Sequence, residues 1–439
     1  MKSGPQIAAA LRREVADWRV WMARGVVIGF AALAGLAVVG FTWLTELALQ
    51  HFFRMRLQWW WSPLLWTPLC TGAIVWLTRR FAPGAAGSGI PQVMASLTPG
   101  VEPEHRALFV SLKLTVAKIL LTAWGLLAGL SLGREGPSVQ IAAGIMHAAR
   151  RWLPRRSTIS VHGLLVAGGA AGIAAAFNTP LGGVMFAIEE LSRNPEQRRS
   201  GLLLAAIVLS GLIAVSVYGN GTHFGVIRAP DIGFSLLLPG LAVALASGIA
   251  GGMFARLLIA SLGTQSNDWF SCWRRRGPVR FAVACGLAVA VIGVVTGGAT
   301  FGSGYASTRN LLEGHGEAPA QYLLFKFIAT WLTAWSGVPG GIFAPALAIG
   351  AAIGNNIALL TDYHAATLIA LGMAGFLAAA TQAPLTAFII VMEMVDGHAM
   401  VLTLMCCAFI SSGVSRMLSH PLYQALAKLQ LERLPRGPS

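Results

Sequence analysis

The sequence predicts an all-α polytopic membrane protein built from two related halves whose helices are interrupted. Three observations predict this fold class: an apolar composition, many apolar runs of membrane-spanning length, and an internal repeat. The chain of 439 residues is 55% hydrophobic and only 11% charged, with a mean hydropathy of +0.66, whereas about 25% of the residues of a soluble protein are charged. Runs close to the roughly 20 residues that span a bilayer are residues 25–49, 107–132, 163–188, 201–218, 232–262, 281–300, 322–349, 366–392 and 400–417.

Several of these runs contain Gly and Pro near their middle, which predicts broken or re-entrant helices. Inside a bilayer such breaks are tolerated only where the freed backbone faces protein or a water-filled cavity. The breaks therefore indicate where a polar site lies within the membrane.

The net charge of +15 at pH 7 is better explained by membrane topology than by nucleic-acid binding. Lys and Arg lie in short segments beside the apolar runs instead of forming a basic domain, as the positive-inside rule requires of cytoplasmic loops. We therefore expect both termini in the cytoplasm and no nucleic-acid partner. The predicted organisation is a cytoplasmic amphipathic helix at 1–24, a first membrane repeat at 25–220, a second at 221–425, and a cytoplasmic tail at 426–439.

The internal repeat is seen in three features that recur 204 residues later, for example at residues 174 and 378. An Ala-Ala-Ala segment, a Pro-Leu pair and a glutamate occur first at 174–176, 180–181 and Glu189, and again at 378–380, 384–385 and Glu393. The same spacing carries Gly133 to Gly337 and Gly136 to Gly340, while Gly87-Ser88-Gly89 recurs at a spacing of 215 as Gly302-Ser303-Gly304. Duplicated halves with matching helix breaks predict a substrate site near the membrane midplane, at the interface of the repeats. We also expect one structural role for Glu189 and Glu393.

Three Gly-Pro turns within the apolar sequence predict an anion site. In the turn at 133–140, Pro137 suits the first turn of a helix and the glycines allow close approach of a ligand. The turns at 87–91 and 337–345 follow the same pattern. Free N–H groups and the positive dipole end at each helix start would attract an anion. Glu135 places a carboxylate at one of these starts, where it can compete with a bound anion.

These three turns resemble the signature motifs of the CLC family of chloride channels and proton/chloride antiporters, and the resemblance covers about residues 25 to 425. It implies inverted-topology repeats and a homodimer in the lipid bilayer, with a pore in each subunit. It further implies chloride and protons as the transported ions, with no cofactor and no metal. The short sequence after Tyr423 resembles the prokaryotic type without cytoplasmic CBS domains.

The resemblance also implies roles for individual residues. Glu135 corresponds to the external gating and proton-transfer glutamate, and Glu190 to the internal proton-transfer glutamate of antiporters. With serine at position 88, the sequence is similar to chloride-preferring members of the family. Backbone N–H groups at 342 and 343 would bind the anion, so that side-chain identity there matters little. The implied chloride-binding residues are Ser88, Gly136, Ile342, Phe343 and Tyr423, with Lys118 and Arg134 contributing positive potential.

Each of these residues also has a structural alternative. Glu135 would cap its own helix or pair with Arg134, Ser88 would cap the helix that starts near Pro91, and Tyr423 would be an interfacial tyrosine. A salt bridge is the alternative for Lys118, whose acidic surroundings are reduced because Gln92 stands where many relatives have Glu. Glu190 would be a surface carboxylate at a helix end.

The function predicted from these observations is proton-coupled chloride antiport across a bacterial inner membrane, controlled by a glutamate gate. The alternative is a voltage- or proton-gated chloride channel of the same fold. An enzyme is not expected, since the sequence contains no HExxH, P-loop or GxSxG motif and its five cysteines show no CxxC spacing.

Overall fold

A computed structural model of the chain describes residues 18–154, 157, 159–192, 201–219, 224–225, 233–263, 268–314 and 320–433. Apart from two isolated bridges, the described residues form helices and connecting turns. Six helical segments among them are long and apolar enough to cross a membrane: Trp18–Gln58, Pro103–Leu127, Phe234–Leu262, Pro278–Val295, Phe343–Thr361 and His398–Leu418.

In the first half, the turn at 133–140 leads into a helix that begins at Glu135, and the break near Pro180 separates two helices. The helices of this half are α2 (Trp18–Gln58), α3 (Ser62–Phe81), α4 (Ile90–Leu97), α5 (Pro103–Ala107), α6 (Leu112–Leu127), α7 (Glu135–Ala148), α8 (Val161–Phe177), α9 (Pro180–Phe186), the π-helical turn η3 (Ala187–Leu191) and α10 (Gly201–Tyr218). The predicted boundary at residue 24 falls inside α2, and the rest of the predicted N-terminal helix, residues 1–17, lies outside the described residues.

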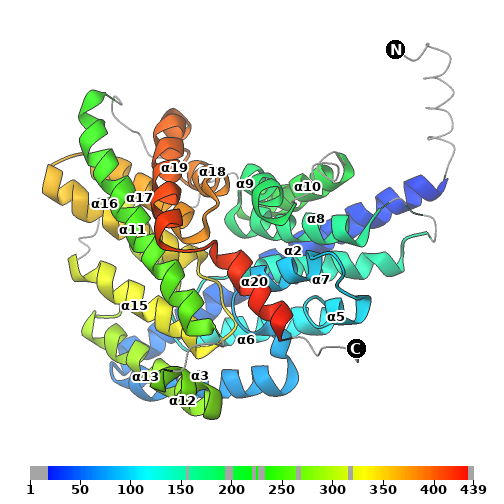
Figure 1. The fold of residues 1–439 in the computed structure, drawn as a ribbon, viewed down its shortest axis with the longest axis horizontal. Helices are drawn as coiled ribbons and strands as arrows, with labels where there is room; N and C mark the ends of the chain where they lie inside the picture. Colours follow the sequence, from blue (N-terminus) through cyan, green and yellow to red (C-terminus); the bar gives the residue numbers. More distant parts are fainter. Residues whose placement is uncertain are drawn as a thin grey trace.

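The second half repeats this series. Its helices are α11 (Leu237–Leu262), α12 (Trp269–Arg276), α13 (Pro278–Val295), α14 (Tyr305–Leu312), α15 (Ala320–Ser336), α16 (Phe343–Thr361), α17 (Ala365–Thr381), α18 (Pro384–Met394), α19 (Val401–Leu418) and α20 (Leu422–Glu432). The predicted tail at 426–439 begins inside α20, and residues 434–439 lie outside the described residues. Figure 1 shows α16 to α19 on one side of the molecule and α7 to α10 on the other, with α20 running between them.

The predicted helix breaks are confirmed. Asn178 separates α8 from α9 with a left-handed backbone (φ 58°), and Gln382 separates α17 from α18 in the same conformation (φ 60°). Pro180 and Pro384 then start the following helices, where a missing N–H is no loss. The apolar run at 322–349 is divided into α15 and α16 by the glycine-rich turn.

The spacing of the repeat is not constant, which corrects one of the predicted equivalences. α7 begins at Glu135 and α16 at Phe343, 208 residues later, and the left-handed glycines that precede these turns, Gly129 (φ 77°) and Gly337 (φ 88°), have the same spacing. Matching Gly133 with Gly337 is therefore wrong: Gly133 corresponds to Gly341. The connections between helices differ in length in the two halves, so the spacing varies between 204, 208 and 215.

The two halves exchange equivalent contacts where α9 packs against α18. The Glu189 carboxylate accepts hydrogen bonds from the first N–H groups of α18, those of Leu385 (3.1 Å) and Thr386 (2.7 Å). Glu393 accepts the equivalent bonds from Leu181 (3.2 Å) and Gly182 (2.7 Å) of α9. Each glutamate thus caps a helix of the opposite half, which confirms the shared structural role.

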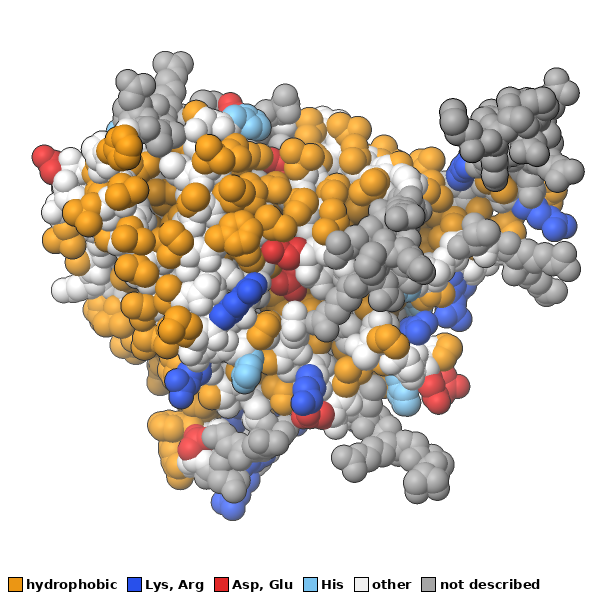
Figure 2. Space-filling view, turned by 45° about the horizontal axis from the view of Figure 1, so that its top comes forward, with side chains coloured by type: hydrophobic (Ala, Val, Ile, Leu, Met, Phe, Trp, Pro, Cys, Tyr) orange, Lys and Arg blue, Asp and Glu red, His pale blue; other side chains and the backbone are white. Residues whose placement is uncertain are grey.

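The surface agrees with a membrane protein. Figure 2 shows hydrophobic side chains over most of the upper part of one face, while many of its Lys and Arg side chains lie lower down. Large apolar side chains are exposed along the spans, among them Leu33 and Trp43 on α2, Leu245 and Ile249 on α11, and Leu402 on α19.

Candidate anion site

Backbone hydrogen bonds join the three Gly-Pro turns to one another. The Gly87 N–H donates to the Val338 carbonyl (3.2 Å) and the Gly340 N–H donates to the Gly87 carbonyl (3.0 Å). Gly133 and Gly341 exchange a pair of bonds of 2.7 and 2.8 Å. The starts of α4, α7 and α16 therefore lie around one place, as the sequence predicts.

Glycine is needed at this junction because the turns are in close contact. Gly89 has φ 105°, and a Cβ there would lie 2.8 Å from the Gly136 carbonyl oxygen. A Cβ at Gly136 would overlap the Ser88 hydroxyl and lie 3.3 Å from Gly341 Cα. Gly136 thus lies against Ser88, with no side chain to separate the turns.

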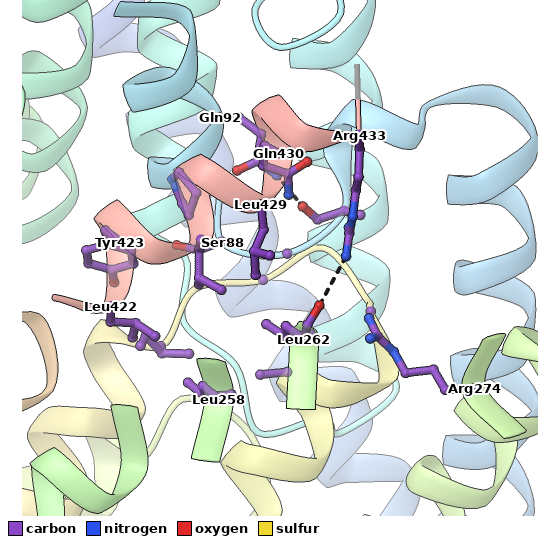
Figure 3. Close-up of a pocket in the computed structure, with 18 residues that line it drawn as sticks. Ser88, Gln92, Leu258, Leu262, Arg274, Leu422, Tyr423, Leu429, Gln430 and Arg433 are labelled. Carbon is purple, nitrogen blue, oxygen red and sulfur yellow. Dashed lines mark hydrogen bonds between the residues drawn. The ribbon is translucent and has the colours of Figure 1, made fainter. Parts of the chain in front are cut away.

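A pocket brings together three of the predicted chloride-binding residues from distant parts of the chain. Ser88, Ile342 and Tyr423 all line it, together with leucines of α11 and α20. The Ser88 Oγ and Tyr423 Oη atoms are buried, and neither has a hydrogen-bond partner among the described residues. Figure 3 shows the two side chains near one another at one end of the pocket. Two buried hydroxyls that lack partners are suited to donate to an anion.

The Phe343 side chain supports this arrangement directly. Its ring stacks on the ring of Tyr423, with centroids 5.9 Å apart and planes 16° apart, and also makes an edge contact with Phe177. The Phe343 side chain therefore packs against Tyr423, in addition to the backbone role that the sequence predicts for residue 343.

Glu135 is fully buried, and each of its carboxylate oxygens has a donor. Oε2 accepts a bond of 3.3 Å from the backbone N–H of Ala344, in the first turn of α16. Oε1 accepts a bond of 2.8 Å from the Tyr305 hydroxyl. The carboxylate therefore occupies the positive end of α16, which is where a free anion would also be attracted.

Tyr305 is a site residue that sequence analysis missed. It lies at the start of α14, directly after the Gly302-Ser303-Gly304 counterpart of the Ser88 turn, so following the repeat one residue further would have found it. Its ring also receives the Arg134 guanidinium, 5.5 Å from the ring centroid. Arg134 forms an ion pair of 2.8 Å with Glu46 of α2. It also interacts electrostatically with Glu135, so pairing with Arg134 stays an alternative role for Glu135.

Lys118 lies beneath the Ser88 turn and is fully buried. Its ammonium donates to the carbonyls of Ala85 (2.8 Å) and Gly87, so its partners are backbone carbonyls instead of the acidic side chain of a salt bridge. The Gln92 side chain bonds the same segment, accepting from the Gly89 N–H (3.0 Å) and donating to Ala86.

Lys326 is the counterpart of Lys118 in the second half and was also missed. It lies 208 residues later, is equally buried, and donates to the carbonyls of Thr300 (3.0 Å) and Gly302 (2.8 Å). Those carbonyls precede the turn that leads into Tyr305. Each lysine thus holds one glycine-serine-glycine turn in place.

Glu190 lies in the π-helical turn η3 and only 8% of its surface is exposed. Its neighbour Glu189 caps α18, so the two adjacent carboxylates point to different surroundings. Both Glu190 and Glu135 interact electrostatically with Tyr423. The alternative of a surface position for Glu190 does not agree with this burial.

The fold and the site together define an integral membrane protein in which interrupted helices of two repeats meet at a buried, donor-rich pocket. The family profile described as voltage gated chloride channel matches residues 69–416. The H(+)/Cl(-) exchange transporter ClcA of Citrobacter koseri is 30% identical over 453 residues, covering 97% of this chain and 92% of that protein. The chain belongs to the voltage gated chloride channel family, the CLC family.

Solved structures share the fold. The crystal structure of a slow cyanobacterial Cl-/H+ antiporter has a TM-score of 0.80 at 24% identity, covering 94% of this chain and 99% of that one. A CLC-type fluoride/proton antiporter has a TM-score of 0.77 at 21% identity, covering 93% and 99%. The inverted-repeat CLC fold expected from the sequence is therefore confirmed.

Proposed function

We propose that this protein exchanges chloride for protons across a bacterial inner membrane, with both termini in the cytoplasm. The observation that carries the proposal is that Ser88, Ile342 and Tyr423 line one pocket. Beside it, the buried Glu135 carboxylate accepts a hydrogen bond from the start of α16, the helix that Ile342 precedes. The relatives that are named as proton/chloride exchangers support it.

In this proposal chloride is held by donors that replace part of its water shell. The hydroxyls of Ser88 and Tyr423 each donate one hydrogen bond, and the backbone N–H groups of Ile342 and Phe343 face the ion at the positive end of α16. Gly136 has no side chain, which allows the turns to pack closely around the ion. Lys118 and Arg134 add positive potential near the ion path, and Lys118 also fixes the turn that carries Ser88.

Glu135 acts as the gate and as the external proton carrier. When ionised, its carboxylate holds the α16 N–H of Ala344 and excludes chloride from that position. When protonated, it loses most of its attraction for the helix dipole and leaves, so that an anion takes its place. Binding of a proton and release of the blocked position are thus one event, which couples the two ions.

Glu190 is the internal proton carrier. Its burial and its electrostatic interaction with Tyr423 support a role in passing protons between the cytoplasm and the interior. The functional unit is a homodimer with one pore per subunit, an assignment that rests on membership of the family. No cofactor or metal takes part in this scheme.

The second candidate function is a voltage- or proton-gated chloride channel of the same fold, and Glu190→Gln separates the two. In liposomes containing the purified variant, the exchanger account predicts that chloride movement continues while chloride-driven proton movement falls to background. Glu189→Gln is the matched control, since that neighbouring carboxylate has a structural role. Unchanged proton coupling in Glu190→Gln would refute its assignment as proton carrier.

A further inference from the structure

The end of α3 and the start of α13 lie side by side at one edge of the molecule. A Cβ at Gly72 of α3 would lie 3.7 Å from Val279, and a Cβ at Gly286 of α13 would lie 2.9 Å from Pro68. The two helices therefore pack closely and run in opposite directions. Figure 1 shows them together with α12, the short helix that leads into α13. The last turn of α3 thus lies beside the junction of α12 and α13.

Exposed arginines gather at this edge without acidic partners. They are Arg79 and Arg80 in the last turn of α3, Arg276 at the end of α12 and Arg280 in the first turn of α13. No ion pair within the described part of the chain involves any of these four. Arg274 adds a further positive charge, and the charge of Arg79 acts on it directly. The edge therefore has an excess of positive charge that the described residues do not neutralise.

Large aromatic side chains are exposed beside these arginines. Trp76 and Phe81 of α3 are both exposed, and their rings make an edge contact with centroids 6.1 Å apart. The Arg80 guanidinium lies over the Phe81 ring, 6.0 Å from its centroid. Trp269 and Phe270 of α12 are exposed as well. Exposed aromatic rings with neighbouring cations are typical of the level of the lipid headgroups.

Aromatic packing holds α12 in this position. The rings of Trp273 and Phe281 of α13 meet edge to face, with centroids 5.4 Å apart. The Phe270 ring contacts Trp335 of α15, with centroids 5.9 Å apart. Arg276 in the last turn of α12 is therefore held close to the first turn of α13.

An apolar surface continues from the arginines along the same helix pair. Away from the basic edge, α3 and α13 expose side chains that include Leu69 and Leu287. A phospholipid could place its phosphate at the arginines and its acyl chains along these apolar faces. The charge of Arg79 also acts on Arg433, which follows the last helix. The basic edge thus lies on the side of the membrane where α20 ends, which the proposed function assigns to the cytoplasm.

We propose that this edge is a binding site for an anionic phospholipid, with Arg79, Arg80, Arg276 and Arg280 around its phosphate. Guanidinium groups donate pairs of hydrogen bonds to phosphate oxygens, and basic groups between helices on the cytoplasmic side suit anionic headgroups. The site is separate from the anion pocket, because none of these four arginines lines that pocket. Lipid binding here does not require chloride transport, so it can be tested independently of the proposed function.

Affinity is measured on the purified protein in detergent, by native mass spectrometry with added phosphatidylglycerol. We expect phosphatidylglycerol to bind more tightly than the zwitterionic phosphatidylethanolamine. Its affinity should fall about fivefold in Arg80→Gln and about 25-fold when Arg276→Gln is added, following the contribution of one basic residue near an anionic surface. Arg54→Gln is the control, since Arg54 is an exposed arginine near the end of α2, at the opposite end of α3. Equal affinity for the two lipids, or an equal loss in Arg54→Gln, would overturn the proposal.

Thermal unfolding separates a lipid from a free phosphate ion. A ligand that binds the folded protein raises its unfolding midpoint, so we expect phosphatidylglycerol to raise the midpoint of the wild type and of Arg54→Gln more than that of the double variant. Inorganic phosphate at the same concentration should leave all three midpoints unchanged. Equal midpoints of the three proteins without lipid would show that the variants are folded. An equal rise with inorganic phosphate and with lipid would refute the role of the acyl chains and with it the lipid site.

Discussion

At the scale of single residues, Glu135, the proposed gate, accepts hydrogen bonds from two donors on two different elements. Ala344 of α16 and Tyr305 of α14 each bond one oxygen of Glu135, and both lie in the second half of the chain while Glu135 lies in the first. The Tyr305 hydroxyl donates to the carboxylate, and a hydrogen bond to an ionised group is stronger than one between neutral groups. How firmly the Glu135 carboxylate is held is therefore adjusted from the opposite repeat.

Replacing Tyr305 by Phe tests this adjustment. The variant loses one of the two donors that hold the Glu135 carboxylate, so the carboxylate leaves the start of α16 more readily. We expect the pH dependence of chloride exchange to move upward by ~1 pH unit, because a hydrogen bond to a charged group is worth about 1.5–3 kcal/mol. Exchange in liposomes is measured from pH 4 to 8. Tyr363→Phe, a change outside the site, is the control, and an unchanged pH profile in Tyr305→Phe would contradict the role.

The buried lysines give a prediction with two distinguishable results. Lys118→Met leaves the carbonyls of Ala85 and Gly87 without their donor, which costs about 2 kcal/mol or more and loosens the turn that carries Ser88. We expect part of this cost, about 1.4 kcal/mol, to appear in chloride binding, which raises the half-saturating chloride concentration about tenfold.

Lys326→Met loosens the turn that leads to Tyr305 instead. Its chloride dependence is expected to stay within about twofold of the wild type, while its pH profile moves in the direction of Tyr305→Phe, following the loss of one turn-holding interaction. Both variants are compared in the same exchange assay. Identical effects of the two lysines on chloride and pH dependence would contradict their separate roles.

At the scale of elements, helix starts explain both the site and the contact between the halves. α16 presents its free N–H groups to Glu135, whereas the starts of α9 and α18 are each closed by a glutamate from the opposite half. The same feature, a helix start with N–H groups free of intrahelical partners, therefore serves the proposed anion binding in one place and assembly of the two halves in the other. The difference lies in whether the carboxylate can leave.

The capping glutamates should affect stability and not transport. Glu189→Ala and Glu393→Ala each remove a carboxylate that accepts two backbone bonds, at a cost of about 1–3 kcal/mol. We expect both variants to lower the thermal unfolding midpoint by several degrees and to similar extents, with the ratio of exchanged ions unchanged. Glu313→Ala, which removes an exposed i,i+4 pair with Arg309, is the control. A clearly unequal loss in the two variants would argue against their equivalence.

Much of this element-level structure could be predicted because its signals are local. Glycine and proline constrain the local backbone, so the turns and breaks can be predicted from short stretches of sequence. Examples are Gly87-Ser88-Gly89, Pro137 and the paired Pro180 and Pro384. The positions of the helix starts around one pocket follow from the repeat. The exact pairing of residues between the two halves could not be predicted, because connections of unequal length change the spacing from 204 to 208 between neighbouring elements.

Contacts between distant segments could not be predicted in the same way. The hydrogen bond from Tyr305 to Glu135 joins residues 170 positions apart. Neither residue type by itself predicts this contact. Arg274 and Arg433 were interpreted as topology signals, since sequence alone does not reveal that α12 and α20 place them at the same pocket. Phe343 was interpreted through its backbone, and its stacking on Tyr423 depends on how α16 meets α20.

At the scale of the whole molecule, the two repeats contribute different parts of the proposed site. The first supplies Ser88, Glu135 and Glu190, and the second supplies the donors that hold the gate and the helix start that attracts the anion. Because a bound anion and the ionised Glu135 carboxylate would use the same helix start, the proposed mechanism links chloride binding there to protonation of Glu135 across the interface of the repeats. Stoichiometric coupling of the two ions is the central claim of this account.

That claim is tested most directly by proton movement in liposomes that contain the purified protein, under an imposed chloride gradient and without a proton gradient. The account predicts that chloride flow drives protons uphill, and that Glu135→Gln abolishes this proton movement. Chloride flow that leaves the internal pH unchanged in the wild-type protein would contradict it and would identify the protein as a channel.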